Sequence, residues 1–366
     1  MIGPDHESRR ARLFEVVDVD AILLTDAVDI RWLTGFSGSN GWVFVSPTRT
    51  TLFTDGRYVD QAEAQCGASD TVVELARDRS EMIAAVANLA SSAVGFQDDK
   101  MTVAEHRDLA TRLTDLRPVG LHLRNLRRRK DRSECATIGR AAHIADLALA
   151  ACSNRLVPGS TERSIRDALE ASMRDHGADG PSYETIVATG PTNSARPHHR
   201  PTPSEIFDGH SVVIDVGALL DGYHSDMTRT FLIGDAPAEL VDWWSLVHEA
   251  QAAGCMVVGP GVPVREVDEA CRRVFRRAGV EDRFVHGTGH GVGLLIHEEP
   301  FIGRHSTSVL EAGDVVTVEP GLYRDGLGGV RIEDLLVVSD EGFQRLSGSP
   351  KQPTPDVRTR EKAPER

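Results

Sequence analysis

Cysteine is scarce in this chain and follows no spacing typical of a disulfide framework or a zinc site. The 366 residues include five cysteines: Cys66, Cys135, Cys152, Cys255 and Cys271. Their number is odd, they are dispersed, and no C-x-x-C pair is present. We therefore expect neither a disulfide framework nor a zinc knuckle, and this cysteine usage predicts a reducing, cytoplasmic location.

Long apolar runs and an excess of basic charge are also missing. No uncharged apolar run reaches the length of about 18 residues that indicates a membrane-spanning helix. The first residues, MIGPDHESRRARLFEVV, contain no apolar core of a signal peptide. The 41 Lys and Arg residues against 55 Asp and Glu give a net charge of −14. The sequence thus predicts no membrane association, and it argues against nucleic acid or an anionic membrane as the main partner.

The length of the chain predicts two domains, because 366 residues exceed the usual size of one. We expect residues 1–125 to form a mixed α/β domain and residues 126–349 to form a second domain. The stretch LRRRKDRSE, which begins the second range, is basic and polar and marks the boundary. Residues 350–366 are rich in proline and charge, and they are predicted to be a disordered tail.

Short patterns predict the individual elements. Asp131 and Glu134 have the spacing of a capping box, which starts a helix that Pro158-Gly159 ends. Ser160 or Thr161 caps the next helix. The remaining predicted elements are strands at 21–24, 42–45, 51–53, 211–216 and 226–233 and helices at 81–89, 103–113, 240–258 and 264–278.

Two aspartates lie on the two arms of a predicted β-hairpin, IDVGALLDGYHSDMTRTF. Its Asp221-Gly222 dipeptide accepts the positive φ angles of a two-residue type I′ turn. That turn places Leu220 opposite Tyr223, Asp215 opposite Thr228, and Asp226 opposite Gly217. Asp215 and Asp226 then point to the same face as diagonal neighbours, about 7–8 Å apart at the backbone. Two such carboxylates need a cation or a shared proton, and we expect Gly217 to leave room for it.

Three further residues have the chemistry of metal ligands. His290 lies in the glycine-rich segment HGTGHGVG, Glu319 ends an apolar strand, and Glu333 follows another. A carboxylate that ends an apolar strand is costly unless it is paired or bound to metal. Four carboxylates and one imidazole suit Mn²⁺, Fe²⁺, Co²⁺ or Zn²⁺, and two divalent cations would neutralise the four charges. The residues therefore predict a dinuclear site.

Each of these signals has a simpler explanation when it is taken alone. An aspartate beside a turn is often a turn or cap residue, and a histidine among glycines is often a loop residue. HGTGHGVG also faintly resembles a phosphate-binding loop, but it lacks the lysine and the glycine spacing of that motif. The order and spacing of the segments favour the metal site.

The ordered set resembles one known family. Asp215, Asp226, His290, Glu319 and Glu333 match the five ligands of the metallopeptidase family that includes methionine aminopeptidase, prolidase and Xaa-Pro aminopeptidase. The blocks DGYHSDMTRTF, HGTGHGVGLLIHEEP, VTVEPGLY and GVRIED resemble its signatures, and RWLTGFSGSNGWVFV and LFTDGRY resemble the N-terminal domain of its Xaa-Pro enzymes. The resemblance implies a mixed α/β N-terminal domain followed by a pita-bread domain with a curved antiparallel sheet.

The resemblance also implies a role for each metal ligand. Asp215 would chelate one of two divalent metal ions, with Mn²⁺ expected and Co²⁺ or Zn²⁺ as alternatives. Asp226 and Glu333 would bridge both ions. His290 and Glu319 would complete the other ion, and Glu319 would exchange a proton with the bridging hydroxide.

Five further residues match positions around the substrate. His198 would contact the scissile amide, and His297 would hydrogen-bond the substrate carbonyl. Arg331 would orient the carboxylates, and His286 and Tyr323 would line the proline side of the cleft. The neighbouring His199, in contrast, is interpreted as a solvent-exposed residue.

The implied activity is that of an Xaa-Pro aminopeptidase, which removes the residue before proline at a peptide N-terminus. The alternative is a prolidase that cuts only Xaa-Pro dipeptides, with Arg196 or Arg331 as the cation for the free carboxylate. A more remote alternative is a pita-bread module that binds peptides without cleaving them. The expected partners are proline-containing peptides and a second copy of the chain in a homodimer.

Overall fold

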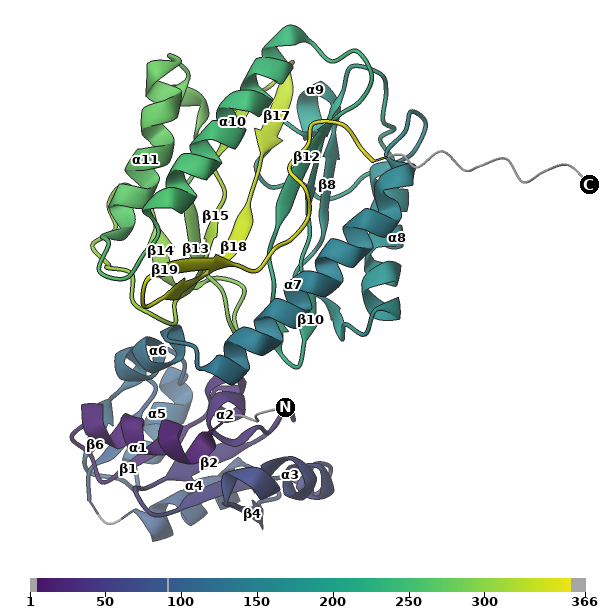
Figure 1. The fold of residues 1–366 in the computed structure, drawn as a ribbon. Helices are drawn as coiled ribbons and strands as arrows, with labels where there is room; N and C mark the ends of the chain where they lie inside the picture. Colours follow the sequence, from purple (N-terminus) through teal and green to yellow (C-terminus); the bar gives the residue numbers. More distant parts are fainter. Residues whose placement is uncertain (1–4, 91, 357–366) are drawn as a thin grey trace, which may run out of the picture. The chain divides into compact units, whose positions relative to one another are not determined.

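The computed structural model describes residues 5–90 and 92–356, which form two compact units that divide between Arg127 and Arg128 (Figure 1). Each unit has its own sheets, helices and apolar core.

The first unit is built on one mixed sheet with the strand order β4-β3-β2-β1-β5-β6. Strand β1 pairs antiparallel with β2 and parallel with β5. The strands are β1 (Ala21–Leu24), β2 (Trp42–Val45), β3 (Thr50–Thr54), β4 (Thr71–Leu75), β5 (Val94–Phe96) and β6 (Leu116–Pro118). The helices are α1 (His6–Val16), α2 (Ala27–Thr34), α3 (Val59–Cys66), α4 (Arg79–Leu89), α5 (Val103–Ala110) and α6 (Gly120–Arg128). The three predicted strands and both predicted helices are confirmed, although α5 ends at Ala110, where Thr111 serves as its C-cap.

One half of the second unit packs two helices, α7 (Arg132–Cys152) and α8 (Glu162–Asp175), on a three-stranded sheet. The sheet has the order β12-β9-β8, from β8 (Ile186–Thr189), β9 (Ser211–Asp215) and β12 (Thr228–Leu232). The capping box of Asp131 and Glu134 is present at the start of α7, and Thr161 caps α8. A buried core that includes Leu169 of α8 and Ile214 of β9 joins the helices to the sheet.

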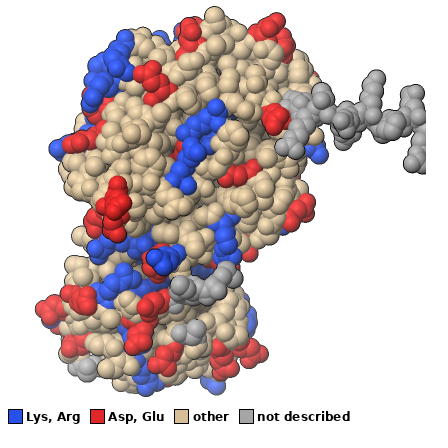
Figure 2. All heavy atoms as spheres, in the orientation of Figure 1, with Lys and Arg blue, Asp and Glu red and all other residues tan. Residues whose placement is uncertain are grey.

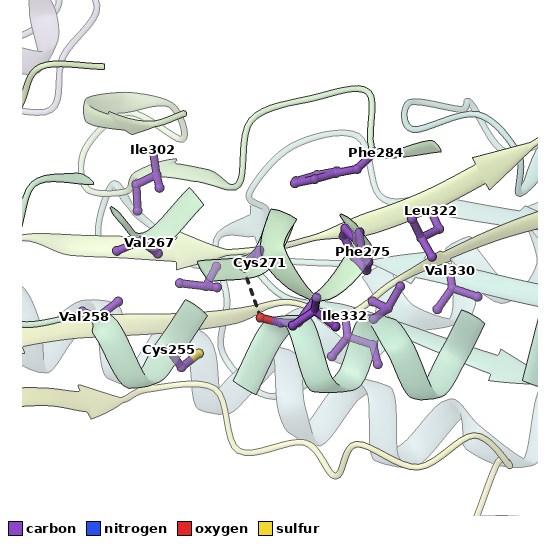
Figure 3. Packing of buried hydrophobic residues seen from close by; sticks show 14 of the residues in the cluster. Cys255, Val258, Val267, Cys271, Phe275, Phe284, Ile302, Leu322, Val330 and Ile332 are labelled. Carbon is purple, nitrogen blue, oxygen red and sulfur yellow. Dashed lines mark hydrogen bonds between the residues drawn. The ribbon is translucent and has the colours of Figure 1, made fainter. Parts of the chain in front are cut away.

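The other half packs α10 (Ala238–Val257) and α11 (Val264–Arg277) on a five-stranded sheet of order β14-β13-β15-β18-β19. Figure 3 shows side chains of its core, among them Phe275 of α11 and Val330 of β17. The strands are β13 (Gly289–Gly291), β14 (Glu298–Ile302), β15 (Val315–Val318), β18 (Asp334–Ser339) and β19 (Gly342–Arg345). Short elements complete the unit: β7 (Gly180–Pro181), α9 (Gly190–Asn193), β10 (Ala218–Leu220), β11 (Tyr223–His224), β16 (Gly321–Arg324) and β17 (Gly328–Arg331).

By length and hydropathy alone, one helical segment among the described residues could cross a membrane, Arg132–Arg155, and 44% of its 18-residue apolar window is buried. This criterion accepts up to two charged residues in the window, whereas the sequence-based expectation concerned uncharged apolar runs, and Arg140 and Asp146 interrupt this segment. One helix of this kind is weak evidence for a membrane protein, because the core helix of a globular domain meets the same criterion. Its buried residues, such as Ala145 and Leu149, pack against α8 and the sheet.

The last described residues, 350–356, make defined contacts. The amide of Leu232 donates to the carbonyl of Pro353 at 2.6 Å, and the hydroxyl of Ser153 donates to the carbonyl of Asp356 at 3.0 Å. The rest of the predicted disordered tail, 357–366, lies outside the described residues.

On the face drawn in Figure 2, acidic and basic side chains are interspersed over the described surface.

Candidate metal centre

The hairpin that carries Asp215 and Asp226 has the predicted register. Asp221 and Gly222 have φ angles of 49° and 75°, as a type I′ turn requires. Leu220 pairs with Tyr223, and Asp215 pairs with Thr228. The hairpin is interrupted midway, since β9 and β12 belong to one sheet and β10 and β11 to another. Asp215 thus ends β9, and Asp226 lies in the break before β12.

Gly217 does not provide space for a metal ion, and this part of the sequence-based prediction is wrong. A Cβ atom at Gly217 would lie 1.9 Å from the carbonyl oxygen of Ser225 and 2.9 Å from the Cβ of Ser182. The glycine instead allows close approach of the opposite strand, where the amide of Ser225 donates to the carbonyl of Ala218 at 3.0 Å.

Tyr183 lies between the two aspartates, and sequence reasoning missed it. Its hydroxyl contacts a carboxylate oxygen of Asp215 and lies 2.5 Å from Oδ1 of Asp226. The two carboxylates therefore converge as predicted, with one phenol joining them. No motif around Tyr183 marks it, because a single tyrosine before a strand carries no recognisable spacing.

Three of the predicted ligands form a compact buried group. One ligand atom from each of Asp226, His290 and Glu333 lies within 4.8 Å of the other two. His290 Nε2 is 3.5 Å from Asp226 Oδ2 and 3.5 Å from Glu319 Oε1, which brings the fourth predicted ligand beside the group. Asp215 joins the cluster through Tyr183.

Glycines on both sides of His290 let β13 pack tightly. A Cβ at Gly289 would lie 2.1 Å from the carbonyl of Thr317, and one at Gly291 would lie 2.3 Å from the carbonyl of Glu299. The glycine-rich segment therefore serves close strand packing, which presents the imidazole of His290 to the carboxylates. This use of the glycines gives no support to a phosphate-binding loop.

The electrostatics of the cluster favour a bound cation. Burial and the neighbouring carboxylates raise the pKa of both Asp226 and Glu333 well above the ordinary carboxyl value. Burial and the same carboxylates also raise the pKa of Tyr183. A divalent cation would relieve this repulsion, and carboxylates with one imidazole are donors that such cations accept. The donor set present in the structure therefore fits a divalent metal.

Arg331 donates hydrogen bonds to four groups in and around the cluster. Its guanidinium donates to Asp215 Oδ2 at 2.7 Å, to Thr228 Oγ1 at 3.0 Å, and to the hydroxyl of Tyr323 and the carbonyl of Pro197 at 2.9 Å each. Burial opposes the positive charge, but Tyr323 and Asp215 outweigh it and the pKa of Arg331 is raised. The structure thus brings Arg331 into contact with the carboxylate of Asp215.

The remaining predicted residues surround a cavity of about 1360 Å³. Its lining includes the cluster, His198, His286 and His297. The rings of His290 and His297 are in edge contact with centroids 4.4 Å apart. His286 Nε2 lies 3.0 Å from the hydroxyl of Tyr323, which is buried and reaches the lining through this contact. Burial lowers the pKa of both His286 and His297, so neutral imidazoles face the cavity near pH 7.

His199 is buried, and its interpretation as a solvent-exposed neighbour of His198 is wrong. Its Nε2 lies 2.9 Å from Glu162 Oε2, and both side chains are almost fully buried. Glu162 also accepts from the amide and hydroxyl of Thr202, from the amide of Thr189 and from Asn193 Nδ2. Burial would raise the pKa of Glu162, but the donors outweigh it and the pKa is lowered. Glu162 therefore holds the segment that carries His198 on both sides, through Asn193 before it and Thr202 after it.

Comparisons with known proteins match both units. Residues 136–340 match the model of the metallopeptidase family M24, and residues 9–128 match that of the creatinase/prolidase N-terminal domain. The chain is 30% identical to the Xaa-Pro dipeptidase of Pyrococcus furiosus, over 94% of this chain and 99% of that protein.

Solved structures give the same result. The structure of an Xaa-Pro dipeptidase from Bacillus anthracis is similar with a TM-score of 0.91 and 35% identity, over 96% of this chain and 99% of that one. An X-Pro aminopeptidase from Thermotoga maritima has a TM-score of 0.88 and 28% identity, over 95% and 99%. The predicted fold is thereby confirmed: a creatinase/prolidase-like N-terminal domain is followed by a pita-bread domain.

Proposed function

Because this chain belongs to metallopeptidase family M24, whose members are metal-dependent hydrolases, we propose that it is an Xaa-Pro aminopeptidase. The observation that carries the proposal is the buried group of Asp226, His290 and Glu333, with Glu319 and Asp215 beside it on the lining of a peptide-sized cavity. The substrate would be a peptide whose second residue is proline.

In this proposal the five ligands would hold two divalent cations, Mn²⁺ or alternatively Co²⁺ or Zn²⁺. Asp215 would serve one cation, His290 and Glu319 the other, and Asp226 and Glu333 both. When bound, the cations would polarise the scissile carbonyl and lower the pKa of a water molecule. The contact of Arg331 with Asp215 keeps one carboxylate oriented for this task.

Residues in and around the cluster would transfer the proton and bind the substrate. Glu319 accepts a proton from the attacking water and passes it to the leaving amine. His297, whose lowered pKa keeps it neutral, donates a hydrogen bond to the substrate carbonyl oxygen. His198 contacts the scissile amide, and His286 and Tyr323 form the wall beside proline.

Neither of the two arginines that the sequence suggested for a dipeptidase is placed to bind a substrate carboxylate in the cavity, and this favours the aminopeptidase. A prolidase needs a cation for the free carboxylate of its dipeptide, and Arg331 is already committed to four neighbours. Arg196 does not belong to the described cavity lining. Val285 and Phe301 on that lining are 64% and 48% exposed, which gives a longer peptide apolar surface to pack against.

A dipeptidase remains the second candidate, because relatives over nearly the full length are Xaa-Pro dipeptidases. Arg304 supplies its cation in that case. It lines the cavity with a side chain that is 55% exposed and lies 2.6 Å from Glu281.

A matched set of peptides tests the proposal. Purified protein loaded with Mn²⁺, Co²⁺ or Zn²⁺ is given Ala-Pro, Ala-Pro-Ala and Ala-Ala-Ala. We expect cleavage of Ala-Pro-Ala, little cleavage of Ala-Pro, and none of Ala-Ala-Ala. Preference for Ala-Pro would establish the dipeptidase instead, and binding without cleavage by metal-loaded protein would indicate a non-catalytic peptide-binding module.

We further infer a cytoplasmic homodimer. All five cysteines are free, and four of them are buried, which suits a reducing compartment. Sedimentation of the purified chain tests the dimer, and a monomer at micromolar concentration would contradict it.

A further inference from the structure

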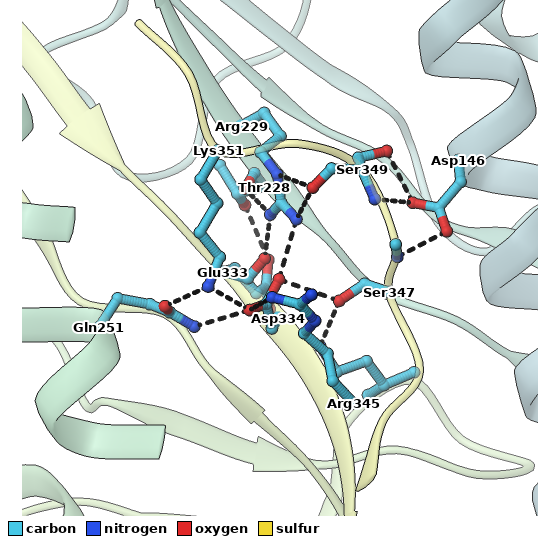
Figure 4. A network of polar contacts seen from close by, with 12 residues as sticks. Asp146, Thr228, Arg229, Gln251, Glu333, Asp334, Arg345, Ser347, Ser349 and Lys351 are labelled. Atoms are coloured by element: carbon cyan, nitrogen blue, oxygen red, sulfur yellow. Dashed lines mark hydrogen bonds and ion pairs between the residues drawn. The ribbon is translucent and has the colours of Figure 1, made fainter. Parts of the chain in front are cut away.

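The end of the described chain is tied into the second unit at several points. We call residues 347–353 the C-terminal strap (Figure 4). Asp146 of α7 accepts from the amide of Gly348 at 2.7 Å and from the amide and hydroxyl of Ser349 at 2.7 and 2.6 Å. The carbonyl of Pro353 accepts from Leu232 of β12. The strap therefore crosses from a helix to a strand of the cluster-bearing sheet.

Arg229 of β12 connects the strap to the strand after Glu333. The guanidinium is buried, and it donates to the carbonyl of Ser349 at 2.7 and 3.1 Å. It also donates to Asp334 Oδ1 at 2.8 Å, to the carbonyl of Thr228 at 2.9 Å and to the carbonyl of Glu333. One side chain thus joins the strap to the backbone on both sides of the candidate metal centre.

Lys351 of the strap completes the network. Its ammonium group contacts Oδ2 of the fully buried Asp334 and donates to Gln251 Oε1 at 2.6 Å. Gln251 Nε2 donates in turn to Asp334 Oδ2 at 3.2 Å, and Ser347 Oγ donates to Asp334 Oδ1 at 3.0 Å. Lys351 and Arg229 are therefore the two close cations that neutralise Asp334.

The polar network of Lys351, Arg229 and Asp334 adjoins the candidate metal centre at Glu333. The amide of Glu333 donates to the carbonyl of Thr228 at 3.1 Å, and Thr228 Oγ1 donates to Glu333 Oε2 at 2.7 Å. Glu333 and Asp334 are consecutive, so the carboxylate of Glu333 reaches the cavity while that of Asp334 reaches the strap. Asp226 lies two residues before Thr228 on the same segment. The contacts of the strap therefore reach Asp334, the residue next to Glu333.

We propose that Lys351 is a positioning residue for the metal centre, which acts through Asp334 and Arg229 to hold Glu333 at the distance from Asp226 that a shared cation requires. The inference rests on the metal site of the proposed function. Loss of outer residues around a metal typically lowers affinity by roughly 10–100-fold. Because Lys351 acts through two other side chains, we expect the lower end, about 10-fold.

The test compares the full-length chain with three variants, Lys351→Met, Lys351→Arg and Arg345→Met. Arg345 is the matched control, since its side chain is 52% exposed and lies 3.8 Å from Asp334. Co²⁺ affinity is measured by competition with a chelator, the visible absorption spectrum of bound Co²⁺ reports ligand geometry, and melting of the metal-free protein reports stability. We expect about 10-fold weaker binding and a changed spectrum for Lys351→Met only, with Lys351→Arg close to wild type.

Two results distinguish a failure of this inference from a failure of the proposed function. Lys351→Met with wild-type Co²⁺ affinity and spectrum would overturn the inference, even if its melting temperature fell. If Lys351→Met does not fold, Lys351→Gln, which removes the positive charge next to Asp334 and remains polar, undergoes the same measurement with the same criterion. A wild-type protein that binds Co²⁺ but cleaves no Xaa-Pro peptide would overturn the proposed function alone.

Discussion

At the scale of single residues, Asp226 is a buried carboxylate of the candidate centre. It lies near His290, Glu333 and the hydroxyl of Tyr183. We expect Asp226→Asn to lower Mn²⁺ affinity by more than the roughly 10–100-fold typical of outer residues, because the substitution removes the charge of a proposed bridging ligand. Turnover of Ala-Pro-Ala should fall below detection. Mn²⁺ stoichiometry by elemental analysis and the peptide assay together check this expectation.

The matched control for that substitution is Asp221→Asn on the same hairpin. Asp221 is exposed, and its φ of 49° is one that asparagine also adopts. This variant should keep wild-type metal content and turnover. Equal metal content and equal rate in Asp226→Asn would contradict the bridging role.

The raised pKa values of Asp226 and Glu333 predict a pH dependence of metal binding. Their carboxyls keep protons in the metal-free fold at pH values where exposed carboxyls have lost them, and a cation must displace these protons. Mn²⁺ affinity should therefore rise as the pH increases from about 5 to 8. The metal-free protein should lose stability over the same range, because the unfolded chain releases those protons first.

Melting curves with and without Mn²⁺ at each pH measure both effects. The rise in melting temperature caused by Mn²⁺ should become larger as the pH increases. A constant rise across the range would show that the two carboxyls carry no displaceable protons.

Residue-level prediction from the sequence succeeded where several residues form an ordered pattern. The segments of Asp215, Asp226 and His290 each carry their own turn or glycine context, so their convergence could be inferred. Tyr183 and Glu162 carry no such context, and their contacts arise from residues distant in the sequence. Only the tertiary structure brings those partners together.

At the scale of elements, the buried carboxylate of Glu162 at the start of α8 holds the segment that carries His198. We expect Glu162→Ala to lower the free energy of unfolding by about 3 kcal/mol, because His199 and Thr202 would lose their buried partner. Since the pKa of Glu162 is lowered, this loss should shrink as the pH falls through the carboxyl range. Chemical denaturation at pH 7 and pH 3 measures the difference.

Asp167→Ala on the same helix is the control, since the side chain of Asp167 is 67% exposed. It should change the free energy of unfolding by less than about 0.5 kcal/mol. Equal effects of the two substitutions would contradict a special role for Glu162.

Helices, strands and turns could be predicted where the pattern that specifies them lies within a few consecutive residues. The capping box at Asp131 and the turn at Asp221 are encoded within a few residues, and both are present in the structure. The strap was not recognised, because proline and charge in residues 350–366 predict disorder. Its contacts come from Asp146, Arg229 and Asp334, whose positions no local pattern reveals.

At the scale of the whole molecule, the five predicted ligands all lie in the second of two compact units. Such units can unfold separately, and a ligand stabilises only the unit that binds it. Calorimetry should therefore show that Mn²⁺ raises the melting temperature of one transition and leaves the other unchanged. At 100 times its dissociation constant, the cation should add about 2.7 kcal/mol to the responding unit.

A chelator supplies the control for that experiment. It should return the responding transition to its metal-free temperature and have no effect on the other. Equal shifts of both transitions on addition of Mn²⁺ would place a binding site in the first unit as well.

The five predicted ligands are far apart in the sequence, so they are synthesised at different times. A ribosome releases Asp215 and Asp226 first, then His290, and finally Glu319 and Glu333, which come from the other half of the pita-bread unit. The early part of the growing chain holds two carboxylates and no imidazole of the cluster. The complete site exists only after synthesis has passed Glu333 and the halves have docked. A cation that requires all five ligands would therefore bind only after both halves of the second unit have been synthesised.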